Sequence, residues 1–412
     1  MKLSHVVAGL SAMSVFEYTC AYPGMKNTVR ELQDRVRTLE KRLPHKLSLH
    51  RRLPQTTENE NEEEDDANEV EVVDPNDDGS LPPVLIGDLA NPPPGGLTPI
   101  GKTIAGILLQ TESGEDSKST YKIPGKLTSK ECKADVCCKW AYVSRDLTTL
   151  FVGPTGRCNR YARAAVRLGF HDAGTWQEGL DYGGADGSIV LAKSEIKRKD
   201  NNGLADIVKL MPEYASKYGV GIADLIQFAA KHAVVTCPLG PRIRTFVGRK
   251  DSSKASQEGL LPGVNDSADK LIDLFQKKTI SPHDLVALLG AHTTSEQFFV
   301  DPKRAGAPQD GTPGVWDTLF YNQTLGLGPL PKQVLRFPSD VVLTSDPRTK
   351  SEWLAFSSGK DAQSHWNEDY AYSYIRLSLL GVNVINKMTE CTKVLPLPGK
   401  AVKDTGKLLV NQ

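Results

Sequence analysis

The sequence lacks an excess of charge, a membrane-spanning run and an internal repeat. Its 50 Lys and Arg residues balance 50 Asp and Glu residues, so the formal net charge is zero. This balance provides no overall field that would favour nucleic acid or an anionic membrane as the partner. Beyond the first residues no stretch approaches the ~20 continuous apolar residues of a membrane span, so we expect a soluble protein. With 412 residues, 39% of them hydrophobic, the chain can bury a sizeable core.

The first residues have the pattern of a secretory signal. Lys2 precedes a short apolar run over residues 6–16, and small residues follow near Ala21. We therefore predict a signal peptide over residues 1–21 and secretion to the extracellular space. A buried N-terminal helix is the alternative, because Glu17 interrupts the apolar run.

The region over residues 22–124 does not have the composition of a packed domain. Residues 26–52 form a basic stretch with helical spacing of apolar residues, best interpreted as an isolated amphipathic helix. Residues 58–78 hold 12 Asp and Glu residues and no Lys or Arg, which predicts disorder. Residues 81–101 are rich in Pro and Gly and indicate a linker or a strap lying on the domain. The whole region is either a removable pro-segment or a retained flexible extension.

Strand-type alternation is scarce in the rest of the chain, and helical periodicity dominates from about Lys130 onward. Examples are residues 224–235, 281–292 and 369–385. Ser281 before a proline is typical of a helix N-cap. We therefore predict a mainly α domain.

Cysteine is scarce, and none of its spacings matches a CxxC zinc or redox motif. One of the seven cysteines, Cys20, falls inside the predicted signal peptide. An even number in a secreted chain favours disulfides over free buried thiols, although six cysteines allow 15 pairings and the spacing does not choose among them. The six are Cys132, Cys137, Cys138, Cys158, Cys237 and Cys391.

The segment AVRLGFHDAGTW carries a candidate catalytic pair. Arg167 and His171 lie four residues apart, so they share one face of a helix, with the apolar Leu168 and Phe170 between them. A neutral histidine can take a proton from H2O2 and return it to the leaving oxygen, while a guanidinium stabilises the developing charge. The pair therefore suits peroxide cleavage, although a solvated surface pair is the alternative.

Two further motifs accompany this pair, GGADGSI over residues 183–189 and LLGAHTTSEQ over residues 288–297. Together the three segments resemble the plant-type haem peroxidase superfamily, and GGADGS is similar to its fungal class II, ligninase-like branch. The resemblance covers residues 125–400 and implies two helical subdomains that sandwich haem b. It also implies a probable monomer that reduces H2O2 and oxidises small-molecule donors through ferryl intermediates, with a C-terminal tail over residues 401–412.

The resemblance assigns roles residue by residue. The distal side of the haem would hold Arg167, His171, Phe170 and an asparagine, which is Asn201, with Asn202 left open. On the proximal side His292 would be the axial ligand of the haem iron, and Asp340 would hold its other ring nitrogen. Two calcium ions are implied: the first bound by Asp172, Gly184, Asp186 and Ser188, the second by Thr293, Asp310, Thr312, Val315 and Asp317. The implied disulfides are Cys132–Cys138, Cys137–Cys391 and Cys158–Cys237.

Residues that specialise this family are missing. The three acids that bind Mn(II) in manganese-oxidising relatives are replaced by Arg160, Ala164 and Phe298, and the surface tryptophan of lignin peroxidases is replaced by Ala287. Ser351 stands where a fourth disulfide would begin. We therefore expect a generic peroxidase acting on small phenols.

Two alternatives remain open. One is a haem-binding scaffold or interaction protein with little turnover. The other is a true ligninolytic peroxidase that uses another surface residue, with four tryptophans as candidates: Trp176, Trp316, Trp353 and Trp366.

Overall fold

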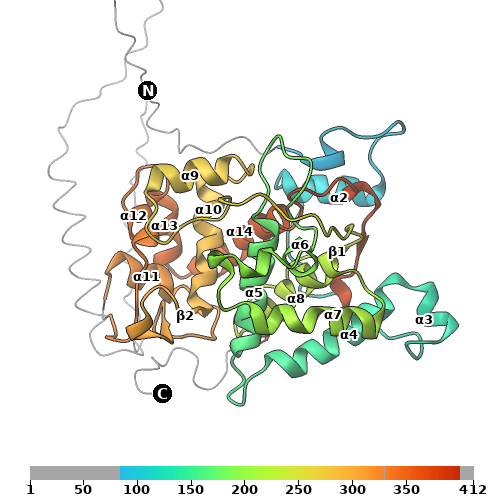
Figure 1. Ribbon diagram of the computed structural model, residues 1–412, viewed down its shortest axis with the longest axis horizontal. Helices are drawn as coiled ribbons and strands as arrows, with labels where there is room; N and C mark the ends of the chain where they lie inside the picture. The colour runs from blue at the N-terminus through green and yellow to red at the C-terminus, as the bar shows by residue number, and fades with distance from the viewer. Residues whose placement is uncertain (1–83, 329, 400–412) are drawn as a thin grey trace, which may run out of the picture. The chain divides into compact units, whose positions relative to one another are not determined.

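The computed structural model describes residues 84–328 and 330–399 of the 412-residue chain. These residues are mainly helical, which confirms the predicted fold class, and the few strands are two residues long (Figure 1). The predicted signal peptide, basic helix, acidic run and C-terminal tail lie outside the described residues. No helix within the described part of the chain is long and apolar enough to cross a membrane.

The described α-helices are α2 (Pro99–Leu108), α3 (Lys130–Ala134), α4 (Val136–Phe151), α5 (Arg160–Ala173), α6 (Ser188–Leu191), α7 (Ala205–Tyr218), α8 (Ile222–Thr236), α9 (Ala268–Gln276), α10 (Pro282–Leu289), α11 (Leu319–Leu325), α12 (Pro338–Leu343), α13 (Lys350–Ser357) and α14 (Ala362–Leu377). Short 3-10 helices are η1 (Gly87–Leu89), η2 (Glu195–Lys197), η3 (Lys199–Asn201), η4 (Gly290–Thr294), η5 (Pro302–Arg304), η6 (Ile385–Lys387) and η7 (Thr392–Val394). Strand β1 (Phe246–Val247) pairs antiparallel with β4 (Thr389–Glu390), and β2 (Glu296–Gln297) pairs antiparallel with β3 (Ala307–Pro308).

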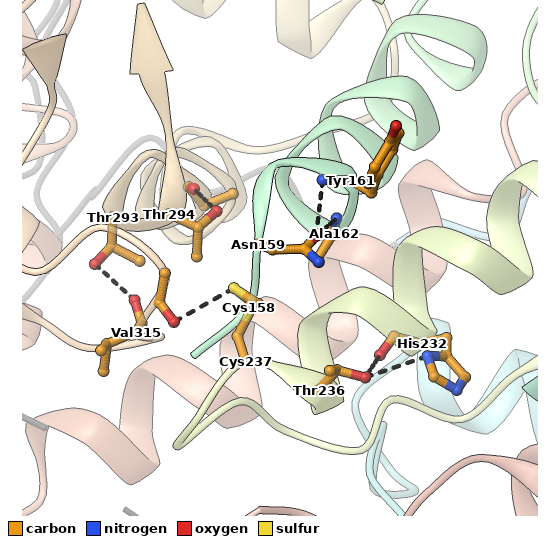
Figure 2. The surroundings of a disulfide bond; sticks show 12 residues. Cys158, Asn159, Tyr161, Ala162, His232, Thr236, Cys237, Thr293, Thr294 and Val315 are labelled. Atoms are coloured by element: carbon orange, nitrogen blue, oxygen red, sulfur yellow. Dashed lines mark hydrogen bonds between the residues drawn. A yellow bond between two sulfur atoms is a disulfide. The ribbon is translucent and has the colours of Figure 1, made fainter. Parts of the chain in front are cut away.

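Helix α5 packs closely on α8 in the first group of helices, α4 to α8 (Figure 1). The side chain of Asn159 caps α5 by accepting hydrogen bonds from the backbone N–H groups of Tyr161 and Ala162 (Figure 2). At Gly169 a Cβ atom would lie 2.6 Å from Cβ of Ala230. Glycine therefore permits the close approach that places one face of α5 against the buried helix α8.

Helix α10 packs on α14 in the second group of helices, α9 to α14. As predicted, Ser281 caps α10, and its side chain accepts a hydrogen bond from the backbone N–H of Asp284. The chain then tightens into η4, where a Cβ atom on Gly290 would lie 2.4 Å from the ring of Trp366. Trp366 also donates a hydrogen bond from Nε1 to the carbonyl of Ala287 at 2.9 Å. These contacts fix the segment that carries His292.

The helical prediction over residues 369–385 is wrong at its end. Helix α14 stops at Leu377, and Gly381 has a left-handed backbone with φ of 73°. The carbonyl of Leu380 accepts a hydrogen bond from the backbone N–H of Ala185 at 2.9 Å. After α14 the chain continues in tight turns and pairs with the glycine-rich loop.

Residues 84–124 pack against the described residues that follow them. Residues 84–124 belong to the same compact unit as the rest of the described chain. Ile104 and Ile107 of α2 are fully buried, and Asp88 accepts a backbone hydrogen bond from Ile385 at 2.7 Å. The described part of residues 81–101 therefore lies against the rest of the unit. The apolar face of α2 requires this packing, which the Pro- and Gly-rich composition of its surroundings obscured.

Three disulfides cross-link the described residues, and they are the three pairs that the resemblance implies: Cys132–Cys138, Cys137–Cys391 and Cys158–Cys237. The last of them joins the residue before the cap of α5 to the end of α8 (Figure 2). The backbone N–H of Cys158 also donates to the carbonyl of Gly314 at 3.1 Å. The disulfide thus holds the start of α5 to the end of α8, and the hydrogen bond holds it to the loop that precedes α11.

Candidate active site

Arg167 and His171 lie side by side on α5, as their spacing predicts. Nε of Arg167 donates to Nε2 of His171 at 3.2 Å. The other two guanidinium nitrogens donate to the backbone carbonyls of Asn202 and Asp200, each at 2.7 Å. Hydrogen bonds to His171 on α5 and to two backbone carbonyls around η3 thus orient all three guanidinium nitrogens. The pair is therefore ordered by hydrogen bonds, although Arg167 is exposed.

Asn201 is the asparagine that contacts the histidine. Its Oδ1 lies 2.8 Å from Nδ1 of His171, and its Nδ2 donates to the carbonyl of Glu195 at 2.7 Å. An amide oxygen can only accept, so Nδ1 of His171 carries the proton and Nε2 presents its lone pair toward Arg167. Asn202 contributes only its backbone carbonyl to Arg167, which resolves the choice that the sequence left open.

The electrostatics of this pair favour a neutral base. Burial and the adjacent Arg167 lower the pKa of His171 to about 3, although the hydrogen bond to Asn201 acts in the opposite direction. Burial also lowers the pKa of Arg167, although its side chain remains accessible to solvent. At neutral pH the site therefore holds an uncharged imidazole beside a guanidinium.

Phe170 provides an aromatic surface beside the pair. Its ring stacks on Phe275 of α9 with centroids 6.0 Å apart, and it meets the ring of His171 edge-on at 5.7 Å. The side chain is half-buried. This is a position in which an aromatic ring can contact a flat apolar ligand.

His292 is oriented from the opposite group of helices. Its Nδ1 lies 3.0 Å from Oδ2 of the buried Asp340, at the start of α12. The rings of Phe320 and Phe337 meet the imidazole edge-on at 5.6 and 5.9 Å. Nε2 makes no hydrogen bond to any residue in the described ranges, and 32% of the side chain is accessible. Nε2 is therefore available to coordinate a metal ion, while the carboxylate of Asp340 contacts the other ring nitrogen.

The residues of the first predicted calcium site converge around a buried carboxylate. Asp172 is fully buried, and burial with the nearby Asp186 raises its pKa well above the ordinary value. Its Oδ1 and the hydroxyl of Ser188 are buried without a hydrogen-bond partner in the described chain. Gly184 lies in the same loop with φ of 89°, and a Cβ there would come within 2.2 Å of the carbonyl of Leu380. Orphaned oxygens beside mutually repelling carboxylates fit a hard cation.

The residues of the second predicted calcium site also converge. The hydroxyl of Thr293 donates to the carboxylate of Asp310 and lies 3.4 Å from the carbonyl of Val315 (Figure 2). The hydroxyl of Thr312 donates to Asp317 at 3.1 Å. Burial raises the pKa of Asp317 to about 6, and burial together with Asp317 raises that of Asp310 well above its usual range. A buried and a half-buried carboxylate, with two hydroxyls and a carbonyl, form a set of oxygen donors suited to Ca2+.

Two residues that contact the site, Glu195 and Gln309, were not predicted from the sequence. Glu195 is fully buried, and besides positioning Asn201 through its carbonyl it accepts hydrogen bonds from the backbone and hydroxyl of Ser256. Gln309 approaches Asp340 with its amide nitrogen at 3.5 Å. A role carried by a backbone carbonyl leaves no signal in residue identity, so Glu195 could not be found from the sequence.

The positions that differ from specialised relatives are also placed. Arg160 pairs with Asp206 at 3.3 Å, Ala164 is half-buried, and Phe298 is 51% exposed. Ala287 is fully buried beneath Trp366. Of the candidate substitute tryptophans, Trp316, Trp353 and Trp366 are fully buried, and Trp176 is half-buried.

A neutral histidine held beside a guanidinium, together with a second histidine backed by a carboxylate, is typical of a haem enzyme that reacts with peroxide. The comparisons agree. The profile of the family described as Peroxidase matches residues 148–359. Ligninase LG5 of Phanerodontia chrysosporium is 32% identical over 299 residues, which cover 67% of this chain and 79% of the relative.

Other relatives give the same result. Ligninase C of Trametes versicolor is 33% identical over 288 residues, covering 64% of this chain and 76% of the relative. The Peroxidase of Arthromyces ramosus is 32% identical over 282 residues, covering 63% and 76%. The chain belongs to the peroxidase family and is a haem-dependent oxidoreductase that uses hydrogen peroxide as its acceptor.

Proposed function

We propose that this protein is a secreted, generic class II-type peroxidase that oxidises small phenols and similar organic donors. The observation that carries the proposal is the ordered set of Arg167, His171 and Asn201 together with the His292–Asp340 pair. A haem-binding scaffold would need neither an acid–base pair nor a carboxylate behind the axial histidine. The three disulfides support an oxidising, extracellular destination.

The residues present fit haem b. Nε2 of His292 is the free donor that an axial iron ligand requires, and Phe170 offers an aromatic face beside the distal pair. The haem would supply a redox-active iron that binds peroxide and takes up its oxidising equivalents. Two calcium ions, one in each cluster of buried oxygen donors, belong to the same proposal.

The protein's own residues then manage the protons and charge. Nε2 of His171 is unprotonated at neutral pH, so it accepts the proton from one peroxide oxygen and returns it to the other oxygen as that atom leaves. Arg167 stabilises the negative charge that develops during cleavage. Asn201 keeps the proton on Nδ1, so that Nε2 stays the base. Asp340 holds the orientation of His292 through Nδ1.

The surroundings of Arg167 and His171 suit small aromatic donors better than a metal ion. Phe298, Phe299 and Val300 are 51%, 57% and 44% exposed. A Cβ atom on Gly203 would lie 2.9 Å from the ring of Phe299 and 3.4 Å from Nη1 of Arg167, so this apolar segment reaches the neighbourhood of the distal pair. The position of Phe298 would have to supply a carboxylate in an Mn(II) site, and Arg160 would add a positive charge.

We also propose that the peroxidase domain includes the strap and α2, and therefore extends over the described residues 84–399. A pro-segment or flexible extension would then end before residue 84.

Steady-state kinetics with a phenol, with Mn(II) and with a non-phenolic aromatic ether test this proposal. We expect saturable phenol oxidation, no saturable Mn(II) oxidation and poor ether oxidation. Efficient Mn(II) turnover would refute the assignment of Arg160, Ala164 and Phe298. Efficient ether turnover would favour the ligninolytic alternative with Trp176 as the candidate surface residue, and absence of all turnover in haem-loaded protein would favour the scaffold alternative.

A further inference from the structure

Four side chains from three helices converge away from the candidate active site. His283 lies in the first turn of α10, Glu352 lies on α13, and His365 and Asp369 lie four residues apart on α14. Figure 1 labels these three helices. One nitrogen or oxygen atom from each lies within 4.8 Å of those of the other three. Two imidazoles and two carboxylates thus share one small volume.

Four short contacts join the two imidazoles to the two carboxylates. Nε2 of His283 lies 3.4 Å from Oε2 of Glu352 and 3.6 Å from Oδ2 of Asp369. Nε2 of His365 lies 3.6 Å from Oε1 of Glu352 and 2.9 Å from Oδ2 of Asp369. Ligands about 2.0–2.1 Å from a tetrahedral Zn2+ stand roughly 3.3–3.4 Å apart. The four side chains could therefore reach one ion with small adjustments.

The surroundings leave two of the oxygens without other partners. Oε1 of Glu352 and Oδ2 of Asp369 are buried and make no hydrogen bond within the described chain, although Nε2 of His365 lies 3.6 and 2.9 Å from them. The fully buried Phe356 packs against both imidazoles, with ring centroids 6.5 Å from His283 and 5.1 Å from His365. Buried oxygens against an apolar wall require a positive charge, which either a bound metal ion or a protonated His283 can provide.

The second nitrogen of one histidine is also oriented. Nδ1 of His283 faces Oδ1 of Asp284 at 3.8 Å, and that oxygen accepts a hydrogen bond from the hydroxyl of Ser373 at 2.9 Å. A carboxylate behind a histidine is the usual outer partner of a metal ligand. His365 is the most accessible member, with 44% of its side chain exposed, so an ion can enter from solvent.

We propose that His283, Glu352, His365 and Asp369 bind one Zn2+ ion as a structural site. Two imidazoles disfavour Ca2+ and Mg2+, which prefer oxygen ligands, and four protein ligands leave no open position of the kind a catalytic zinc needs. The ion ties α13 and α14 to α10, and α10 leads directly into the segment that carries His292. Zinc binding therefore stabilises the proximal half of the molecule.

The test uses full-length, haem-loaded protein in buffer with excess Ca2+, titrated with Zn2+ against a chromophoric chelator. We expect one Zn2+ per chain, a rise in melting temperature, and a zinc-edge absorption spectrum with four nitrogen and oxygen ligands at about 2.0–2.1 Å. His365→Gln and Asp369→Asn should each weaken Zn2+ binding by at least about tenfold and abolish the rise in melting temperature.

Glu368→Gln is the matched control, because it removes an adjacent, exposed carboxylate from the same helix and should bind Zn2+ like the unmodified protein. Peroxidase turnover and haem absorbance without Zn2+ show that each variant is folded. The proposal is overturned if the unmodified protein binds no Zn2+, which would leave the cluster as an ion-pair network. It is equally overturned if the two ligand variants bind like the control, or if the spectrum shows five or six ligands.

Discussion

The pH dependence of the reaction with peroxide provides a sharp test of the distal site. Burial and Arg167 lower the pKa of His171 to about 3, so its Nε2 should remain an available base down to strongly acidic solution. An imidazole with the ordinary pKa of about 6.5 is only ~3% unprotonated at about pH 5. The environment of His171 is therefore worth roughly 30-fold in available base at that pH.

Asn201→Asp is the perturbation that should reverse this effect. It puts a carboxylate where Oδ1 of Asn201 now lies 2.8 Å from Nδ1 of His171, and a negative charge there stabilises the imidazolium. If the change restores the ordinary pKa, the rate at about pH 5 falls ~30-fold relative to the rate at about pH 7.5, where His171 stays mostly neutral. The ratio of the two rates is the diagnostic quantity, because loss of the hydrogen bond to Glu195 is expected to lower the rate at every pH.

The assay is stopped-flow mixing of haem-loaded enzyme with H2O2, followed by haem absorbance. Asn202→Asp serves as the control, since Asn202 contacts Arg167 only through its backbone carbonyl and the substitution retains that group. The pH below which the rate falls should be higher in Asn201→Asp and nearly unchanged in Asn202→Asp. If this pH did not rise in Asn201→Asp, or rose equally in both variants, the assigned role of Asn201 would be refuted.

Further predictions concern the two histidines and the calcium ions. His292→Ala should abolish stable haem binding or remove the basic axial ligand, and a variant that retained full haem absorbance and turnover would contradict the proximal assignment. His171→Ala should retain haem but slow the reaction with peroxide by ~10²–10⁴-fold, measured by the same stopped-flow assay. Removal of calcium by a chelator should lower the melting temperature and disturb the haem spectrum together, because Asp172 and Thr293 adjoin the two histidines; an unchanged melting temperature after verified removal would count against both sites.

The local parts of the site could be predicted from the sequence because their geometry is set by helix periodicity. Arg167 and His171 must share a face if residues 160–173 are helical, and the cap at Ser281 follows from the serine–proline pair. The choice between Asn201 and Asn202 could not be made in this way. It depends on how η3 is oriented by contacts with Arg167 and Glu195, and neighbouring residues of a short 3-10 segment point in different directions.

Contacts between distant segments were the part that residue patterns could not supply. The packing of α2 depends on Asn386 and Ile385, which lie far along the chain. The cluster of His283, Glu352 and the α14 pair joins three helices, and only the spacing of His365 and Asp369 could be recognised along the chain. Such sites become visible only when the helices are placed in space.

Because Ala287 is buried, the surface tryptophan of lignin peroxidases has no exposed counterpart at this position. This residue is fully buried, and its carbonyl accepts hydrogen bonds from Trp366 at 2.9 Å and from the hydroxyl of Tyr321 at 3.3 Å. A tryptophan introduced there would have to displace these rings, and overpacking of this kind typically costs about 1–3 kcal/mol. The position therefore cannot simply regain a solvent-exposed indole by substitution. In this chain the aromatic cluster around Trp366 and Tyr321 packs α10 against α14 and α11.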